Sequence, residues 1–169
     1  MKTLIISSNC SGGGKTTFTL GLMKALKNRS YDVQGYKVGP DYIDTGFHTE
    51  ITGKVSRNLD LHLMGEEGVK ASFSRGNGDL AVVEGVMGLY DGKGLDESCS
   101  TYSVSKVLDN APILLVITPK AQSVTLCAEI NGTTPITIQG AAFGKQNTAK
   151  SILNDILKIA ERKKTAVYS

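Results

Sequence analysis

The stretch that decides the fold is Thr3-Leu4-Ile5-Ile6-Ser7-Ser8-Asn9-Cys10-Ser11-Gly12-Gly13-Gly14-Lys15-Thr16-Thr17. It starts with a short apolar run, which predicts a β-strand that is buried on both faces. The consecutive glycines that follow predict a tight loop whose backbone N–H groups can point inward. A helical pattern runs from residue 18 to residue 26. A strand, a glycine loop and a helix start in this order predict a loop that binds phosphate.

The loop and the first helical turn supply the residues that we expect to contact a nucleotide. These residues are Asn9, Cys10, Ser11, Gly12, Gly13, Gly14, Lys15, Thr16 and Thr17. A helix N-terminus carries a partial positive charge that favours anions, and a lysine at this place reaches the β- and γ-phosphates. The Thr16 hydroxyl is expected to bind Mg²⁺. The full motif has a glycine where this chain has Asn9, and the simpler interpretation is a glycine-rich turn before an ordinary helix.

Length, composition and charge favour a single globular domain and argue against zinc, membrane and nucleic-acid binding. The chain has 169 residues, enough for a single domain with a substantial core, and three cysteines without a zinc-site spacing. No apolar run has the length of a membrane span, and the chain starts with a strand, so we expect a cytoplasmic protein that does not contact a membrane. The net charge of +3 comes from scattered basic residues, which argues against nucleic-acid binding.

Further strands alternate with helices along the chain. We predict strands at 33–38, 80–83 and 112–118, with weaker ones at 136–138 and 165–168. We predict helices at 66–74, 101–108, 123–130 and 151–162, a loop at 39–48, and irregular or weakly helical structure at 49–64. Strands alternating with helices predict an α/β fold with a doubly wound, mostly parallel sheet and helices on both faces, as in P-loop NTPases.

Charged residues gather where two predicted strands end. Lys37, Asp41 and Asp44 lie at or after the end of one strand, and Glu84 and Asp91 at or after the end of another. In open α/β sheets, ligands bind at this edge. Glu84 at the end of a buried strand is expected to hold Mg²⁺ directly or through water. The alternatives are a capping or surface role for Glu84 and a turn role for Asp91.

Three motifs together resemble one protein family. They are Lys-Val-Gly-Pro-Asp-Tyr-Ile-Asp at 37–44, Asn-Leu-Asp at 58–60, and Glu-Gly-Val-Met-Gly-Leu-Tyr-Asp-Gly at 84–92. In order and spacing, this set resembles the N-terminal ATP-binding synthetase domain of the cobyrinic acid a,c-diamide synthases. That family belongs to the dethiobiotin-synthetase-like branch of the P-loop NTPases. The resemblance extends from residue 1 to about residue 130.

The resemblance implies an ATP- and Mg²⁺-dependent ligase of cobalamin biosynthesis, which amidates corrin carboxylates through an acyl phosphate. It implies Mg²⁺ binding by Thr16, Asp41 and Glu84. Asp44 and Asp91 would position the substrate or ammonia, and Lys37 would bridge the phosphate and the substrate carboxylate. Tyr42 and His48 are lesser candidates, and for His48 a structural hydrogen bond is favoured over a role as general base. Asn58 and Asp60 are interpreted as caps of their own loop.

The last part of the chain departs from the family pattern. Gly144 stands where family members carry an asparagine that recognises the nucleotide base. No cysteine lies in the context of a glutaminase nucleophile, so we expect residues 1–169 to form a truncated, single synthetase domain without the glutaminase domain. Ammonia would then come from a glutaminase domain or subunit outside this chain. The family also suggests a homodimer.

Four alternative functions share part of this sequence pattern. A hydrogenobyrinate or nickel-sirohydrochlorin diamide synthase would share these motifs, so the tetrapyrrole substrate is open. A dethiobiotin-synthetase-like ligase would share the core chemistry. A MinD- or ParA-like ATPase switch would share the variant loop, although such switches carry a second lysine near its start. A domain that only binds nucleotide is the fourth alternative.

Overall fold

The computed structural model describes residues 1–93 and 96–117. They lie in the first of two compact units, Met1–Thr118 and Pro119–Ser169. The elements predicted at 123–130, 136–138, 151–162 and 165–168, and Gly144, fall outside the described residues. Within the described part of the chain, no helix has the length and apolar character required to cross a membrane.

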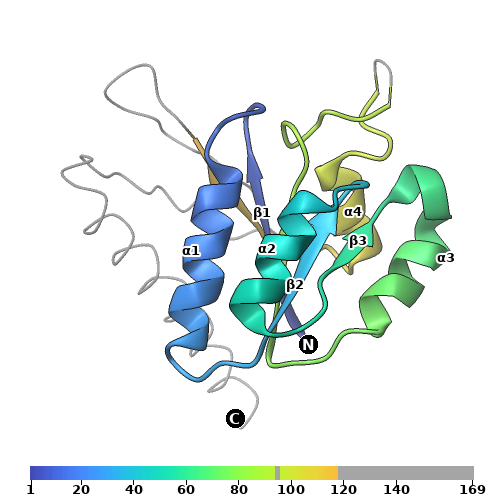
Figure 1. Ribbon diagram of the computed structural model, residues 1–169. Helices are drawn as coiled ribbons and strands as arrows, with labels where there is room; N and C mark the ends of the chain where they lie inside the picture. Colours follow the sequence, from blue (N-terminus) through green and yellow to red (C-terminus); the bar gives the residue numbers. More distant parts are fainter. Residues whose placement is uncertain (94–95, 118–169) are drawn as a thin grey trace, which may run out of the picture. The chain divides into compact units, whose positions relative to one another are not determined.

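A five-stranded parallel sheet forms the centre of this unit (Figure 1). Its strands are β1 (Lys2–Ser8), β2 (Val33–Val38), β3 (Arg57–Leu59), β4 (Leu80–Glu84) and β5 (Ile113–Val116). Their order across the sheet is β3-β2-β4-β1-β5. The predicted α/β class and parallel sheet are therefore confirmed, and the predicted strand at 33–38 has the observed bounds.

Helices cover both faces of the sheet. They are α1 (Lys15–Lys27), α2 (Ile43–Thr52), α3 (Leu61–Ser74) and α4 (Thr101–Val107). Helix α1 packs beside α2, and α3 beside α4. Adjacent residues of a strand point to opposite faces. Tyr36 packs in the core that includes Val69 of α3 and Val104 of α4, whereas Gly35 faces His48 of α2.

The sheet grows to opposite sides from the β1–β4 pair: β2 and β3 lie on one side of this pair, and β5 lies on the other. Helix α1 leads from β1 toward β2, and α4 leads from β4 past β1 to β5. The two strands are direct neighbours, so their carboxyl ends form the switch point of a doubly wound sheet. Ligands bind at such a point in this class of fold. The phosphate loop follows β1, and the segment that starts at Glu84 follows β4.

The prediction of a loop at 39–48 was wrong from residue 43 onward. Helix α2 begins at Ile43, so Asp44 and His48 are helical. The Asp41 carboxylate accepts hydrogen bonds from the backbone N–H groups of Ile43 (2.9 Å) and Asp44 (3.0 Å) and so caps the helix start. The helix was not predicted because its buried residues, His48 and Thr52, are polar. The segment therefore lacks the apolar periodicity that indicates a helix.

The prediction of irregular or weakly helical structure at 49–64 was wrong at 57–59, although both ends of this stretch are helical. The short strand β3 lies there, paired with β2, and three residues leave little apolar periodicity to detect. Helix α3 begins at Leu61 rather than at residue 66, and Asp60 caps it by accepting from His62 N (2.8 Å) and Leu63 N (3.1 Å). Gly65 interrupts the helix with a φ of 64°.

Gly35 lets α2 approach the sheet, and we expect Gly35→Ala to destabilise the fold. A Cβ at this position would lie 2.9 Å from His48 Cβ and 3.2 Å from Met23 Cε. Overpacking of this kind costs about 1–3 kcal/mol. The matched control is Gly21→Ala on α1, where a Cβ meets nothing within 4 Å. That change should stabilise by about 0.5–1 kcal/mol. Urea unfolding measures both values, and equal stability of Gly35→Ala and the unmodified chain would contradict the close packing.

Candidate functional site

The phosphate loop joins β1 to α1 and is built around its glycines. Gly12 (φ 72°) and Gly14 (φ 86°) have left-handed backbone conformations that other residues rarely adopt. At Gly13, a Cβ would lie 3.0 Å from Ser8 Oγ, so the loop lies close against the end of β1. Asn9, Cys10 and Ser11 are exposed. The loop therefore presents accessible backbone at the N-terminus of α1, which suits an anion.

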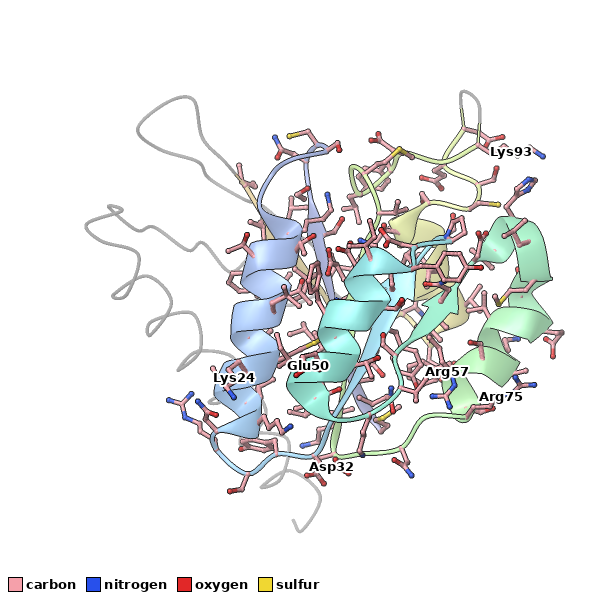
Figure 2. The ribbon with its side chains drawn as sticks, viewed as in Figure 1. Lys24, Asp32, Glu50, Arg57, Arg75 and Lys93 are labelled. Carbon is pink, nitrogen blue, oxygen red and sulfur yellow. The ribbon has the colours of Figure 1, made fainter. Side chains whose placement is uncertain are left out.

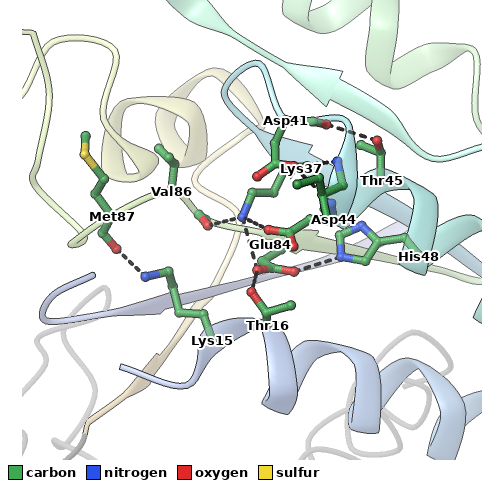
Figure 3. A network of polar contacts seen from close by, with 12 residues as sticks. Lys15, Thr16, Lys37, Asp41, Asp44, Thr45, His48, Glu84, Val86 and Met87 are labelled. Atoms are coloured by element: carbon green, nitrogen blue, oxygen red, sulfur yellow. Dashed lines mark hydrogen bonds and ion pairs between the residues drawn. The ribbon is translucent and has the colours of Figure 1, made fainter. Parts of the chain in front are cut away.

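Lys15 links the phosphate loop to the segment after β4. Its Nζ donates hydrogen bonds to Ser8 Oγ (2.9 Å), to the Cys10 carbonyl (3.2 Å) and to the Met87 carbonyl (2.5 Å; Figure 3). Burial lowers the pKa of the Lys15 ammonium, and the nearby charge of Lys37 lowers it further. The Lys15 ammonium group is thus held at the loop by three neutral oxygens. Phosphate oxygens of a bound nucleotide can replace these oxygens as hydrogen-bond acceptors.

Glu84 is the centre of a buried polar network (Figure 3). Its side chain is fully buried, and its two carboxylate oxygens have different partners. Oε1 accepts from Thr16 Oγ1 (2.5 Å) and Lys37 Nζ (3.1 Å), whereas Oε2 is 2.8 Å from His48 Nε2. Burial alone would raise the pKa of Glu84, but the hydrogen bonds from His48 and Thr16 and the charge of Lys37 lower it to about 2. Glu84 is therefore ionised at neutral pH.

Lys37 places one charge between two acids. Its Nζ lies 2.6 Å from Asp44 Oδ2 and 3.1 Å from Glu84 Oε1, and it donates to the Gly85 carbonyl at 3.1 Å. Lys37 and Glu84 occupy partnered positions in the β2–β4 register, so their side chains point to the same face of the sheet. The structure thus brings together four predicted site residues, from α1, β2, α2 and β4: Thr16, Lys37, Asp44 and Glu84.

His48 completes this network. The imidazole is fully buried, with Nε2 facing Glu84 and Nδ1 lying 3.3 Å from Ser56 Oγ. From the sequence, His48 was predicted to lie on a loop, and Ser56 was not a candidate residue. Residues four apart share a helix face. If 43–52 had been predicted as a helix, His48 would therefore have been expected on the same face as Asp44. Nothing in the local sequence marks Ser56.

Asp41 joins this network only at its edge, through the backbone N–H of Asp44 (Figure 3), whereas the Asp91 carboxylate bonds within its own turn. Asp41 caps α2, and Asp91 Oδ2 accepts from Gly88 N at 2.8 Å within its own turn. In the described residues, neither carboxylate contacts Thr16 or Glu84. Their predicted roles with Mg²⁺ and the substrate therefore stay predictions.

The Thr16–Glu84 pair suits Mg²⁺ that arrives with a nucleotide. Both residues present hard oxygen atoms, and these atoms face each other beside the phosphate loop. Residues 1–93 and 96–117 contain no group of three or more His, Cys, Asp and Glu side chains placed to hold a metal ion. Mg²⁺ commonly uses one or two carboxylates together with phosphate oxygens and water, rather than an all-protein cage. The site fits that arrangement.

Charged residues also lie on the outer surface, away from this network. Lys24 of α1 and Glu50 of α2 are exposed, and Figure 2 shows them with other surface charges. Lys24 lies nine residues after Lys15, which corresponds to about two and a half helical turns. The same helix therefore carries one buried lysine at the loop and one exposed lysine far from it.

Known proteins with similar sequences identify the family of this chain. Residues 4–167 match the CobQ/CobB/MinD/ParA nucleotide binding domain. The proteins named cobyrinate a,c-diamide synthase from Clostridium tetani and Clostridium acetobutylicum are each 69% identical over 132 residues, covering 78% of this chain and 30% of each relative. The relative of that name from Streptococcus sanguinis is 48% identical over 136 residues, with the same coverage. The chain thus spans about 30% of the length of these relatives. The resemblance found in the sequence is confirmed, and the chain belongs to the CobQ/CobB/MinD/ParA nucleotide binding domain family.

Proposed function

We propose that this chain supplies the ATP-binding part of a cobyrinate a,c-diamide synthase. In this proposal it binds ATP with Mg²⁺ at the phosphate loop and activates the a and c side-chain carboxylates of cobyrinate for amidation. The names of the relatives support cobyrinate as the proposed substrate. The match to a nucleotide binding domain supports the proposed use of ATP.

The observation that carries the proposal is the position of Lys37 between Glu84 and Asp44. Glu84 contacts Thr16 at the start of α1, next to the phosphate loop. Asp44 is half-buried on the other side of Lys37. A cation in this position can neutralise two anions that must meet, the γ-phosphate and an attacking carboxylate.

The proposed reaction has two steps. A carboxylate oxygen of the substrate attacks the γ-phosphorus, the bond from that phosphorus to the bridging oxygen breaks, and ADP leaves. Ammonia then attacks the acyl carbon, the carbon–oxygen bond to phosphate breaks, and the nitrogen loses a proton to give the amide. Mg²⁺ would supply charge neutralisation on the phosphates. Lys15 and the loop N–H groups would hold the phosphates, and Asp44 and Asp91 would orient the substrate or ammonia.

Ammonia would come from a glutaminase domain or subunit outside these 169 residues, and a homodimer is part of the same proposal. The test supplies cobyrinate, ATP, Mg²⁺ and ammonium chloride to the chain and follows the products by mass spectrometry. We expect the mono- and diamide with ammonium, and none with glutamine as the nitrogen source. Hydrogenobyrinate and nickel-sirohydrochlorin in parallel reactions identify the preferred tetrapyrrole. ATP binding without any amide would instead support a domain that only binds nucleotide.

A further inference from the structure

We propose that His48 is a positioning residue that holds Glu84 in the orientation required for Mg²⁺ binding. The inference rests on the proposed function, because it assigns Glu84 to the Mg²⁺ of a bound nucleotide. His48 itself would contact neither nucleotide nor metal. It would act through the carboxylate of Glu84 alone.

The two oxygens of Glu84 carry the argument. Oε2 is directed to His48 Nε2 at 2.8 Å, and this leaves Oε1 directed to Thr16 and Lys37. An ionised carboxylate only accepts hydrogen bonds, so the proton of this contact belongs to Nε2. Without His48, Oε2 would be a buried, charged acceptor without its donor, which is unfavourable. Rotation of the carboxylate would relieve that cost and would turn Oε1 away from Thr16.

His48 is itself held on two sides. Its Nδ1 lies 3.3 Å from Ser56 Oγ, and the Ser56 backbone N–H donates to Thr49 Oγ1 at 3.0 Å. The absence of a side chain at Gly35 lets the His48 Cβ lie against β2. These contacts fix both the position and the plane of the ring. In metal sites, outer partners that orient a ligand in this way typically contribute a factor of about 10–100 in metal affinity.

Calorimetry of ATP binding over a series of Mg²⁺ concentrations tests this role. The 169-residue chain is compared with His48→Leu, His48→Gln and Ser56→Ala. His62→Gln is the matched control, because His62 is the other histidine of the chain and is exposed on α3. We expect His48→Leu to raise the Mg²⁺ concentration for half-maximal enhancement of ATP binding about 10–100-fold. His48→Gln, which keeps an N–H donor, should recover most of that loss, and ATP affinity in EDTA should not change.

Three results of these titrations would overturn or support the positioning role of His48. A folded His48→Leu chain with an unchanged Mg²⁺ requirement, or with ATP binding weakened equally in Mg²⁺ and in EDTA, would overturn the positioning role. If His48→Leu does not fold, Ser56→Ala decides: a Mg²⁺ requirement raised several-fold at unchanged EDTA affinity supports the role, and no change overturns it. Absence of Mg²⁺-dependent ATP binding in the unmodified chain would overturn the proposed function, and the His48 role with it.

Discussion

Replacing Lys15 with alanine is expected to weaken ATP binding by about 100-fold or more. The Lys15 ammonium lies at the phosphate loop and is held there by Ser8 Oγ and by the carbonyls of Cys10 and Met87. In the complex, phosphate oxygens would take over these hydrogen bonds. Each hydrogen bond to a charged group is worth about 1.5–3 kcal/mol, and about 1.4 kcal/mol corresponds to a tenfold change in affinity. Isothermal titration calorimetry with MgATP measures the loss.

Lys24→Ala is the matched control for Lys15→Ala. Both residues are lysines of α1, but Lys24 is exposed and far from the loop. We expect Lys24→Ala to bind ATP as the unmodified chain does. Thermal unfolding of both variants shows whether each is folded under the conditions of the titration. Equal ATP affinity of folded Lys15→Ala and Lys24→Ala would contradict the assignment of the phosphate loop.

Glu84→Gln is expected to remove the Mg²⁺ dependence of ATP binding and to slow amide formation by about 100-fold or more. The substitution keeps the shape of the side chain but removes the charge that faces Thr16 and Lys37. A catalytic metal ion supplies several kcal/mol of charge stabilisation, and each 1.36 kcal/mol is a factor of ten in rate. The measurements are ATP affinity with Mg²⁺ and with EDTA, together with the rate of amide formation from ammonium.

Glu67→Gln provides the control for this second change. Glu67 is an exposed acid on α3 that pairs with Lys70 at 3.0 Å, and exposed pairs of this kind contribute little to stability. Its ATP affinity and amide formation should match those of the unmodified chain. A Glu84→Gln chain that keeps the full effect of Mg²⁺ would show that Glu84 is not a metal ligand, and Asp41 would then be the candidate to examine.

Local patterns were sufficient to predict the centre of the sheet and the phosphate loop. The apolar runs at 4–6 and 80–83 are typical of strands with both faces covered, and they lie in β1 and β4. The loop between β1 and α1 was predicted from the order of a strand, glycines and Lys15. Each of these features depends on residues close together in sequence, which is why sequence alone identifies them.

The remaining features depend on contacts between distant residues. Helix α2 was missed because its buried positions include His48, whose partner Glu84 lies 36 residues away. The pairing of Lys37 with Asp44 required that helix to be placed correctly. The family resemblance implied roles for Lys37, Asp44 and Glu84. It did not predict that the Lys37 ammonium group contacts both carboxylates. Burial of these charges is compatible with the fold only because they satisfy one another.

Transfer of oxygen from substrate to phosphate tests the acyl-phosphate chemistry most directly. Cobyrinate with ¹⁸O in its carboxylates is supplied to the chain with ATP, Mg²⁺ and ammonium, and the inorganic phosphate is analysed by mass spectrometry. The proposed reaction predicts one ¹⁸O atom in phosphate for each amide formed, because the carboxylate oxygen leaves with the phosphoryl group. Phosphate that carries no label, with its new oxygen derived from water, would contradict carboxylate activation at this site and would indicate simple hydrolysis of ATP.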